Sequence, residues 1–343
     1  MKNRIFAMAA LAAALFASCN KETEMINPTP EARPDGASVT ITLSSGDDAQ
    51  TRAFFDATAT AEAWEKTLSS LSVFTFNTSG DLILRRDFTA SELASKSATF
   101  SLPKSAAGTE CSFYAVANYD ASSAKTKSAL TALVEKSAGD YNGTFADVST
   151  KALRSGGFVM SGSTTKTVGA VNTSTQVGIS LKRTVAKVAL QTSIDPEFSE
   201  KYPGSITITS VKLSRAASQS LVVAGTPSTG AMTYTHTQTP GTASSKYNSL
   251  FYVYETGTLN AGSRVLLEIN ATYDSDGSSS TSSDRSDVTY SIELTGKAAG
   301  QILRNGYYRV AANITGLVGQ DCQVSVTVAD WETPVTQSVD LGA

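Results

Sequence analysis

After the first 36 residues the chain begins to alternate strictly between apolar and polar side chains, and this period of two restricts the fold more than any other feature. Within residues 37–44, Val39, Ile41 and Leu43 lie on one face, and threonine or serine residues lie on the other. The pattern is typical of a β-strand with one buried face. Polar and charged residues follow and indicate an exposed loop, so the Arg52-Ala53 bond behind it is open to a trypsin-like protease. The alternative is an ordinary first strand and linker.

Stretches with strand character continue along the chain, with turn signals between them. Helical spacing is confined to residues 58–71, where Trp64 is expected in the core, and to residues 125–135. The chain is therefore expected to be all-β, with two tandem β-sandwich domains and a few short helices. We place the N-terminal domain at 37–178 and the C-terminal domain at 179–343. The further predicted strands are 71–77, 82–86, 97–102, 111–119, 157–162, 165–171, 205–213, 232–236, 249–254, 264–273, 288–294, 306–314 and 323–329. Residues 176–194 form a long apolar stretch, interrupted by Lys182, Arg183 and Lys187, that is expected to carry the chain from one domain to the next.

Composition and motifs exclude several function classes. The net charge of -3, without any basic cluster, argues against a nucleic-acid partner. The single histidine, His236, lies in a threonine-rich stretch and leaves little room for acid–base catalysis. Asp274-Ser-Asp276-Gly277 resembles the start of a calcium loop, but Arg285 stands where that pattern requires glutamate, so a solvated turn is favoured. We expect no enzyme, no catalytic residues, no metal site and no cofactor.

Two cysteines, Cys111 and Cys322, lie within apolar strand patterns. Two separate buried thiols are favoured over a disulfide, because buried cysteine packs as a small apolar side chain. The pairing cannot be deduced from sequence, so a bridge stays open as the alternative.

The N-terminus reads as an export signal rather than as structure. Residues 1–18 combine basic residues with a short apolar stretch, and Leu15-Phe16-Ala17-Ser18-Cys19 looks like a bacterial lipobox. Lipid on Cys19 would attach the chain to a membrane, and the charged, proline-containing residues 19–36 would form the tether. The alternative is an ordinary signal peptide that happens to contain a cysteine.

The last residues, 331–343, alternate again. Val335, Val339 and Leu341 share one face, with Gln337 as the only polar interruption. Pro334 suits the start of a strand or an edge strand. Such a segment has the character of a strand that adds to an open sheet edge.

Several short segments follow one another along the chain: the lipobox ending at Cys19, TRA (51–53), SGDLI (79–83), FYAVAN (113–118), FVMSG (158–162), LKRTVAKVAL (181–190), RNGYYRVAANITG (304–316) and VTVADW (326–331). In their order and spacing the chain resembles the fimbrillin family, the type V pilus subunits of Bacteroidia. The resemblance implies transthyretin-like sandwiches and export as a lipoprotein that carries palmitate or another acyl chain on Cys19. It also implies cleavage between Arg52 and Ala53 by an arginine-specific protease. That cut would release the plug strand of Val39, Ile41 and Leu43, and the 335–341 strand of a neighbouring subunit would fill the groove.

The expected function is therefore a structural fimbrial subunit of stalk type, polymerised by donor-strand exchange at the cell surface. Its expected partners are other fimbrial subunits, the maturation protease and, before cleavage, the outer membrane through the lipid. The alternatives are a fimbrial anchor, a tip subunit, or a surface lipoprotein that binds glycan. A glycan binder would present clustered exposed aromatic residues, whereas Trp64 and Trp331 both lie in expected core positions.

Overall fold

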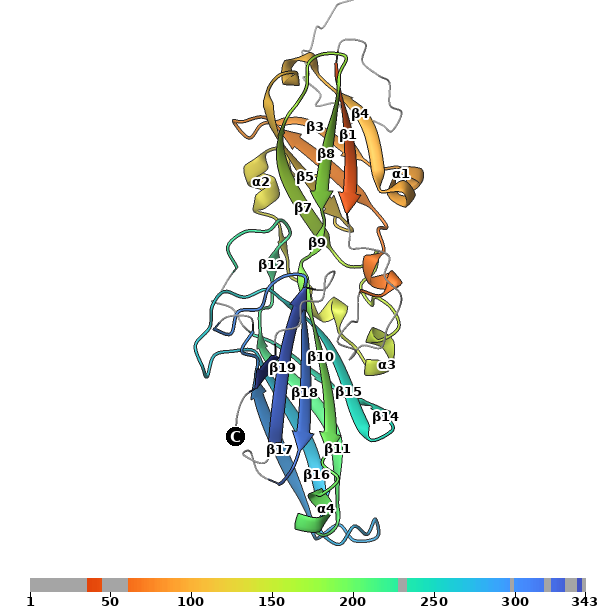
Figure 1. The fold of residues 1–343 in the computed structure, drawn as a ribbon, viewed down its shortest axis with the longest axis vertical. Helices are drawn as coiled ribbons and strands as arrows, with labels where there is room; N and C mark the ends of the chain where they lie inside the picture. The colour runs from red at the N-terminus through yellow and green to blue at the C-terminus, as the bar shows by residue number, and fades with distance from the viewer. Residues whose placement is uncertain are drawn as a thin grey trace, which may run out of the picture.

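The computed structural model describes residues 36–44, 61–227, 233–296 and 299–317, together with the backbone of strands at 322–330 and 338–340. Strands dominate these residues, and Figure 1 shows two stacks of strands placed end to end along the long axis of the molecule. The all-β sandwich fold expected from the alternation is confirmed. The domain boundaries given above stay a prediction.

The N-terminal sandwich pairs a three-stranded sheet with a five-stranded sheet. The smaller sheet has the order β4-β1-β8 and the larger the order β3-β2-β5-β7-β9. Buried residues from both sheets, such as Ile41 and Phe113, belong to one hydrophobic core. The strands are β1 Ala37–Ser44, β2 Leu71–Phe76, β3 Leu82–Asp87, β4 Ser97–Leu102, β5 Glu110–Ala117, β7 Met160–Thr167, β8 Ser174–Ser180 and β9 Lys182–Arg183.

The C-terminal sandwich pairs a six-stranded sheet, β14-β15-β10-β18-β19-β20, with a four-stranded sheet, β13-β11-β16-β17. Its core lies between residues such as Val188 on one sheet and Ile269 on the other. A two-stranded pair, β6 (Val134–Glu135) with β12 (Ser220–Leu221), joins distant parts of the chain. The strands are β10 Val185–Ile194, β11 Ser205–Ala216, β13 Tyr234–Gln238, β14 Gly241–Ala243, β15 Lys246–Tyr254, β16 Leu266–Asp274, β17 Arg285–Glu293, β18 Gly306–Ile314, β19 Cys322–Asp330 and β20 Ser338–Asp340.

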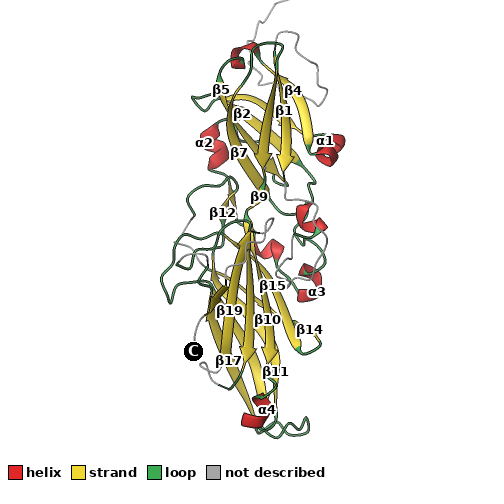
Figure 2. Ribbon diagram, in the orientation of Figure 1, coloured by secondary structure: helices red, strands yellow, loops and turns green. Residues whose placement is uncertain are grey.

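The helices are short and lie at the margins of the sheets (Figure 2). The helix expected over residues 58–71 is wrong within the described part: only η1 is helical there, a single 3-10 turn closed by a capping box between Glu62 and Glu65. Within the range 125–135, where a helix is expected, Lys127–Thr131 form helix α2. Val134 and Glu135, at the end of that range, form strand β6 instead. The helices are η1 Ala63–Lys66, α1 Ala90–Ser95, η2 Lys104–Ala106, α2 Lys127–Thr131, η3 Ala138–Tyr141, α3 Phe145–Val148 and α4 Phe198–Lys201.

Strands β7 and β8 approach each other closely at Gly162. A Cβ atom on this residue would lie 2.1 Å from the backbone carbonyl oxygen of Ser180. Gly162→Ala is therefore expected to lower the free energy of unfolding by roughly 1–3 kcal/mol, because the backbone has to move apart. Urea unfolding would measure the change. Gly178→Ala is the matched control, since Gly178 is exposed and has open space around its Cβ position. Equal midpoints for the two variants would contradict the close approach.

Candidate functional site

Strand β1 is the central strand of the three-stranded sheet (Figure 1). It pairs antiparallel with β4, so that Ile41 lies opposite Ala98, and parallel with β8, so that Ile41 also lies opposite Val177. The edges of β4 and β8 that face β1 form their backbone hydrogen bonds with it. Removal of β1 would therefore leave two open strand edges with a gap of one strand between them.

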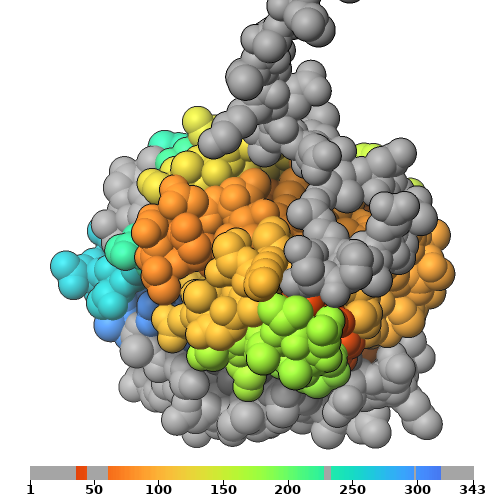
Figure 3. Space-filling view, turned by 90° about the horizontal axis from the view of Figure 1, so that it is seen from above, coloured from red at the N-terminus to blue at the C-terminus, as the bar shows by residue number. Residues whose placement is uncertain are grey.

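The inward side chains of β1 are fully enclosed. Ala37, Val39 and Ile41 are 0% exposed and Leu43 is 4% exposed, and all four belong to the core of the N-terminal sandwich. The alternate residues Thr42 and Ser44 are exposed. In the view from above, the red of β1 is visible as a small area beside green and orange segments (Figure 3). The apolar face predicted from the sequence is thus the face that fills the groove between β4 and β8.

Hydrogen bonds also fix β1 at both ends. Near its start, the Ser38 amide donates to the Thr173 carbonyl oxygen at 3.0 Å. Near its end, the Leu43 amide donates to the Lys96 carbonyl oxygen at 2.9 Å, and the Ser44 carbonyl oxygen accepts from the Leu181 amide at 3.0 Å. The Lys96 carbonyl oxygen is available there because α1 ends in the left-handed conformation at that residue.

Most of the other predicted site residues lie outside the described residues. These are Cys19, Arg52, Ala53, Val335 and Leu341, and their roles stay predictions. Val339 lies in β20, whose backbone pairs antiparallel with β19 at the edge of the six-stranded sheet, opposite Val326. Part of the segment expected to leave the molecule is thus paired with its own chain in this structure.

Residues considered for chemistry have structural partners. The Nε2 atom of His236 lies 3.2 Å from the Gly143 carbonyl oxygen, and its ring faces Tyr234. Trp64 packs on the core with its ring centroid 6.1 Å from that of Phe158. Cys111 is a free and buried thiol, and burial raises its pKa. These contacts favour structural roles.

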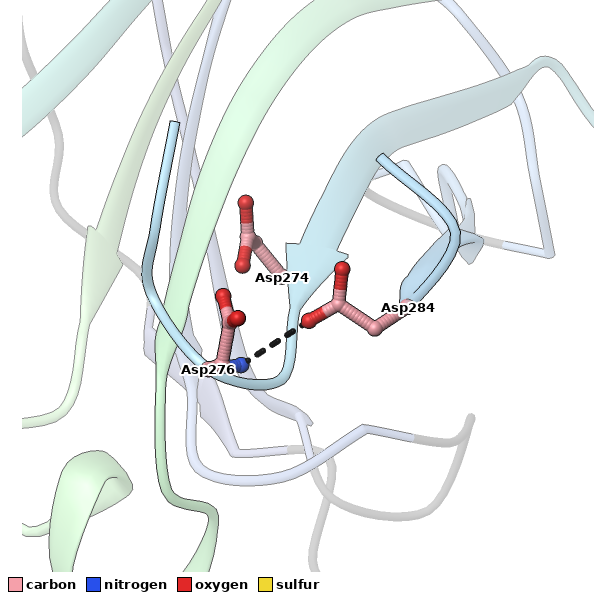
Figure 4. A group of neighbouring side chains, drawn as sticks. All are labelled: Asp274, Asp276 and Asp284. Carbon is pink, nitrogen blue, oxygen red and sulfur yellow. Dashed lines mark hydrogen bonds between the residues drawn. The ribbon is translucent and has the colours of Figure 1, made fainter. Parts of the chain in front are cut away.

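Three aspartates gather at the tip of the β16–β17 hairpin (Figure 4). Carboxylate oxygens of Asp274, Asp276 and Asp284 lie within 4.8 Å of one another. The Arg285 side chain, which replaces the glutamate of a calcium loop, donates from Nε to Asp274 Oδ2 at 3.0 Å. Asp284 Oδ2 accepts from the Asp276 amide at 3.1 Å. The hairpin thus supplies its own cation and donors, which is consistent with a solvated turn.

A surface cavity of about 450 Å³ lies beside β2, β3 and β5. Charged and polar side chains of its lining form hydrogen bonds with neighbouring groups of the protein. Arg85 donates from Nε and Nη2 to the two carboxylate oxygens of Asp87 at 3.0 and 2.9 Å. Asn118 Oδ1 accepts from the amides of Ser69 and Ser70. The lining therefore serves the local fold and does not point to a ligand.

A buried ionic cluster that was not predicted from the sequence connects the two sandwiches. Glu65 of η1 is 0% exposed and Lys187 of β10 is 1% exposed, and their side chains meet at 2.7 Å. Tyr252 donates its hydroxyl to the same carboxylate at 2.9 Å, and Arg183 Nε donates to the Glu65 carbonyl oxygen at 2.9 Å. Burial by itself raises the pKa of the Glu65 carboxyl, but the neighbouring Lys187 and Arg183 charges hold that pKa below its usual value. The charges inside the apolar stretch 176–194 were the only sequence signal of this cluster.

Together, the inserted strand and the paired sandwiches define a class of all-β proteins whose first strand completes a sheet from the middle. Residues 37–185 match the family model described as the major fimbrial subunit protein (FimA). The resemblance to the fimbrillin family is therefore confirmed. A search of curated proteins found no match. Among the described residues, no helix has the length and apolar character needed to cross a bilayer.

Solved structures share the fold over most of the chain. A candidate cell adhesion protein from Bacteroides eggerthii is 18% identical with a TM-score of 0.58, over 89% of this chain and 98% of that one. Another from Parabacteroides distasonis is 16% identical with a TM-score of 0.59, over 89% and 99% of the two chains. The tip fimbrial protein Mfa3 from Porphyromonas gingivalis is 14% identical with a TM-score of 0.51, over 86% and 99%. At these identities the likeness is one of fold.

Proposed function

We propose that the chain is a structural subunit of a cell-surface fimbrium, of stalk type, that polymerises by exchange of strand β1 for the C-terminal strand of another copy or of a related subunit. One observation carries the proposal: β1 is a central strand with an enclosed apolar face, and it lies on the N-terminal side of the predicted cut at Arg52. In this scheme Cys19 takes the lipid, export leads to the outer membrane, and an arginine-specific protease cuts between Arg52 and Ala53.

The energetics of β1 support a replacement by another strand. Burial of each large apolar side chain contributes roughly 1.5–3 kcal/mol, and each ladder hydrogen bond adds about 1 kcal/mol. The stabilisation that β1 contributes through Val39, Ile41, Leu43 and the ladders on both sides is therefore comparable with the free energy of unfolding of a whole domain, ~5–15 kcal/mol. A cut subunit that lost β1 would be strongly driven to bind a strand of similar pattern.

The C-terminal segment has the matching pattern. Val339 and Leu341 repeat the two-residue spacing of the inward face of β1, and Val335 lies on the same face beyond the polar interruption at Gln337. At ~3.3 Å per residue, residues 335–341 span about 23 Å, which is the length of a typical strand. Assembly would require β20 to leave the edge of β19, with which the described backbone forms three residue pairs.

Limited digestion tests the proposed cut. Trypsin added to the folded precursor is expected to cut first after Arg52, because the residues around it have the polar character of an exposed loop. The cut protein should then form ladders on SDS gels run without boiling. N-terminal sequencing of the product should give Ala53. A digest that attacks the strands of either sandwich first would refute the proposal.

Truncation after Pro334 separates a stalk subunit from a tip subunit. The truncated subunit is expected to accept a strand but to offer none, because residues 335–341 are gone. Added to wild-type protein during assembly, it should shorten the fibres in proportion to its share, as measured by electron microscopy. The fold alone does not distinguish these types, since a tip fimbrial protein shares it. Unchanged fibre length would exclude a donor role for this segment.

A further inference from the structure

Glu65 lies on the side of the proposed cut that stays with the mature chain, whereas β1 lies on the side that leaves. The fate of the segment that contains Glu65, residues 61–70, therefore decides what the new N-terminus does after cleavage. A loose segment could fold back over the open groove, whereas a fixed one would leave the groove clear.

The contacts of Glu65 come from the C-terminal sandwich and from its own turn. Lys187 and Tyr252 bind Oε1 at 2.7 and 2.9 Å, and the Glu62 amide donates to Oε2 at 2.8 Å. Lys187 is held in turn against the ring of Tyr307, at 5.0 Å from its centroid. Because these partners belong to β10, β15, β18 and the turn itself, the bonds do not need β1 to be present.

The segment is also fixed on either side of Glu65. Ala61 is 3% exposed and belongs to the core, and Trp64 packs on Phe158. At the other end, Asn118 adopts a left-handed conformation with φ 59° and accepts from the Ser69 amide at 2.8 Å. Residues 61–70 are thus held by contacts near both ends and in the middle, from the domain junction to the start of β2.

We propose that the Glu65 carboxylate anchors residues 61–70 to the C-terminal sandwich, so that this segment keeps its place when β1 leaves. The inference rests on the proposed function, since it concerns the chain after the cut. The anchor limits the freed N-terminus to the few residues before Ala61 and keeps the two sandwiches joined while the groove is empty. An incoming strand then competes with the departing β1 and not with a long tail.

Hydrogen exchange read by mass spectrometry tests the anchor in the full-length chain. Before the cut, Glu65→Gln is expected to speed exchange at the amides of Glu62, Glu65 and Ser69 by at least about tenfold over wild type, because local opening becomes easier. After trypsin cleavage in the presence of a synthetic peptide of residues 331–343, wild-type β4 and β8 should report departure of β1, whereas the three amides should change by less than about twofold. In the cut Glu65→Gln protein they should exchange at least about tenfold faster than in the cut wild type.

Two further variants make the result decisive. If Glu65→Gln fails to fold, Glu65→Gln/Lys187→Met removes both buried charges at similar volume, and the same acceleration is expected. Glu268→Gln is the control, because its 2.8 Å pair with Lys212 is on the surface, with side chains 23% and 42% exposed. Equal exchange of wild type and the anchor variants overturns the anchor. Failure of the peptide to displace β1 refutes the proposed function instead, and the uncut proteins still decide on the anchor.

Discussion

A chain with Arg52→Ala is expected to remain a full-length lipidated precursor and to form no fibres. Without the cut, β1 stays covalently linked to the segment anchored at Glu65. A strand that briefly leaves the groove is then still held nearby at an effective concentration of the order of mM, which a strand from another subunit cannot match. Ladders on unboiled SDS gels and fibres in electron micrographs would both be absent.

Arg52→Lys provides the control for this experiment. Trypsin cuts after lysine, so the purified variant should assemble after trypsin treatment as the wild type does. On the cell, where the proposed protease is arginine-specific, the same variant should stay uncut. Ordered fibres from Arg52→Ala would mean that assembly does not depend on release of β1.

Several strands could be predicted well from their apolar residues. The stretch 97–102 coincides with β4, since alternation between apolar and polar residues leaves only one way to place it against a core. The stretch 306–314 coincides with β18, which is buried on both faces and is therefore apolar along most of its length. The helix expected over 58–71 shows the opposite case. Its apolar spacing is real, but the Glu65 side chain binds buried partners and Leu71 starts β2, so tertiary contacts override the local pattern.

The candidate groove could be predicted only in part. The inward face of β1 is visible in the sequence, but the parallel partner β8 begins 130 residues later, and nothing local connects Ser44 with Ser180. The Glu65–Lys187 pair spans 122 residues in the same way. Buried lysine in an apolar strand indicates that a partner exists, because such charges are almost never buried alone, but it does not say which carboxylate is the partner.

Ile41→Ala is expected to destabilise the precursor strongly and to leave the fibre unchanged. Ile41 is 0% exposed in the centre of β1, between Ala98 and Val177. Loss of its buried methyl groups leaves a cavity and lowers the free energy of unfolding of the uncut chain by about 2–5 kcal/mol. After the cut, β1 should leave at least about tenfold faster, since each 1.4 kcal/mol changes such an equilibrium tenfold. Urea unfolding of the precursor and the time course of ladder formation would measure the two effects.

Subunits inside the fibre are expected to be insensitive to this substitution, because they no longer contain the strand that carries it. Ile41→Ala fibres should therefore dissociate in urea or SDS at the same point as wild-type fibres. Thr42→Ala is the matched control, because the Thr42 side chain on the same strand is exposed and its loss should change precursor stability by less than about 0.5 kcal/mol. If Ile41→Ala weakened the fibre as much as the precursor, β1 would still occupy the groove in the fibre, and its exchange for a C-terminal strand would be excluded.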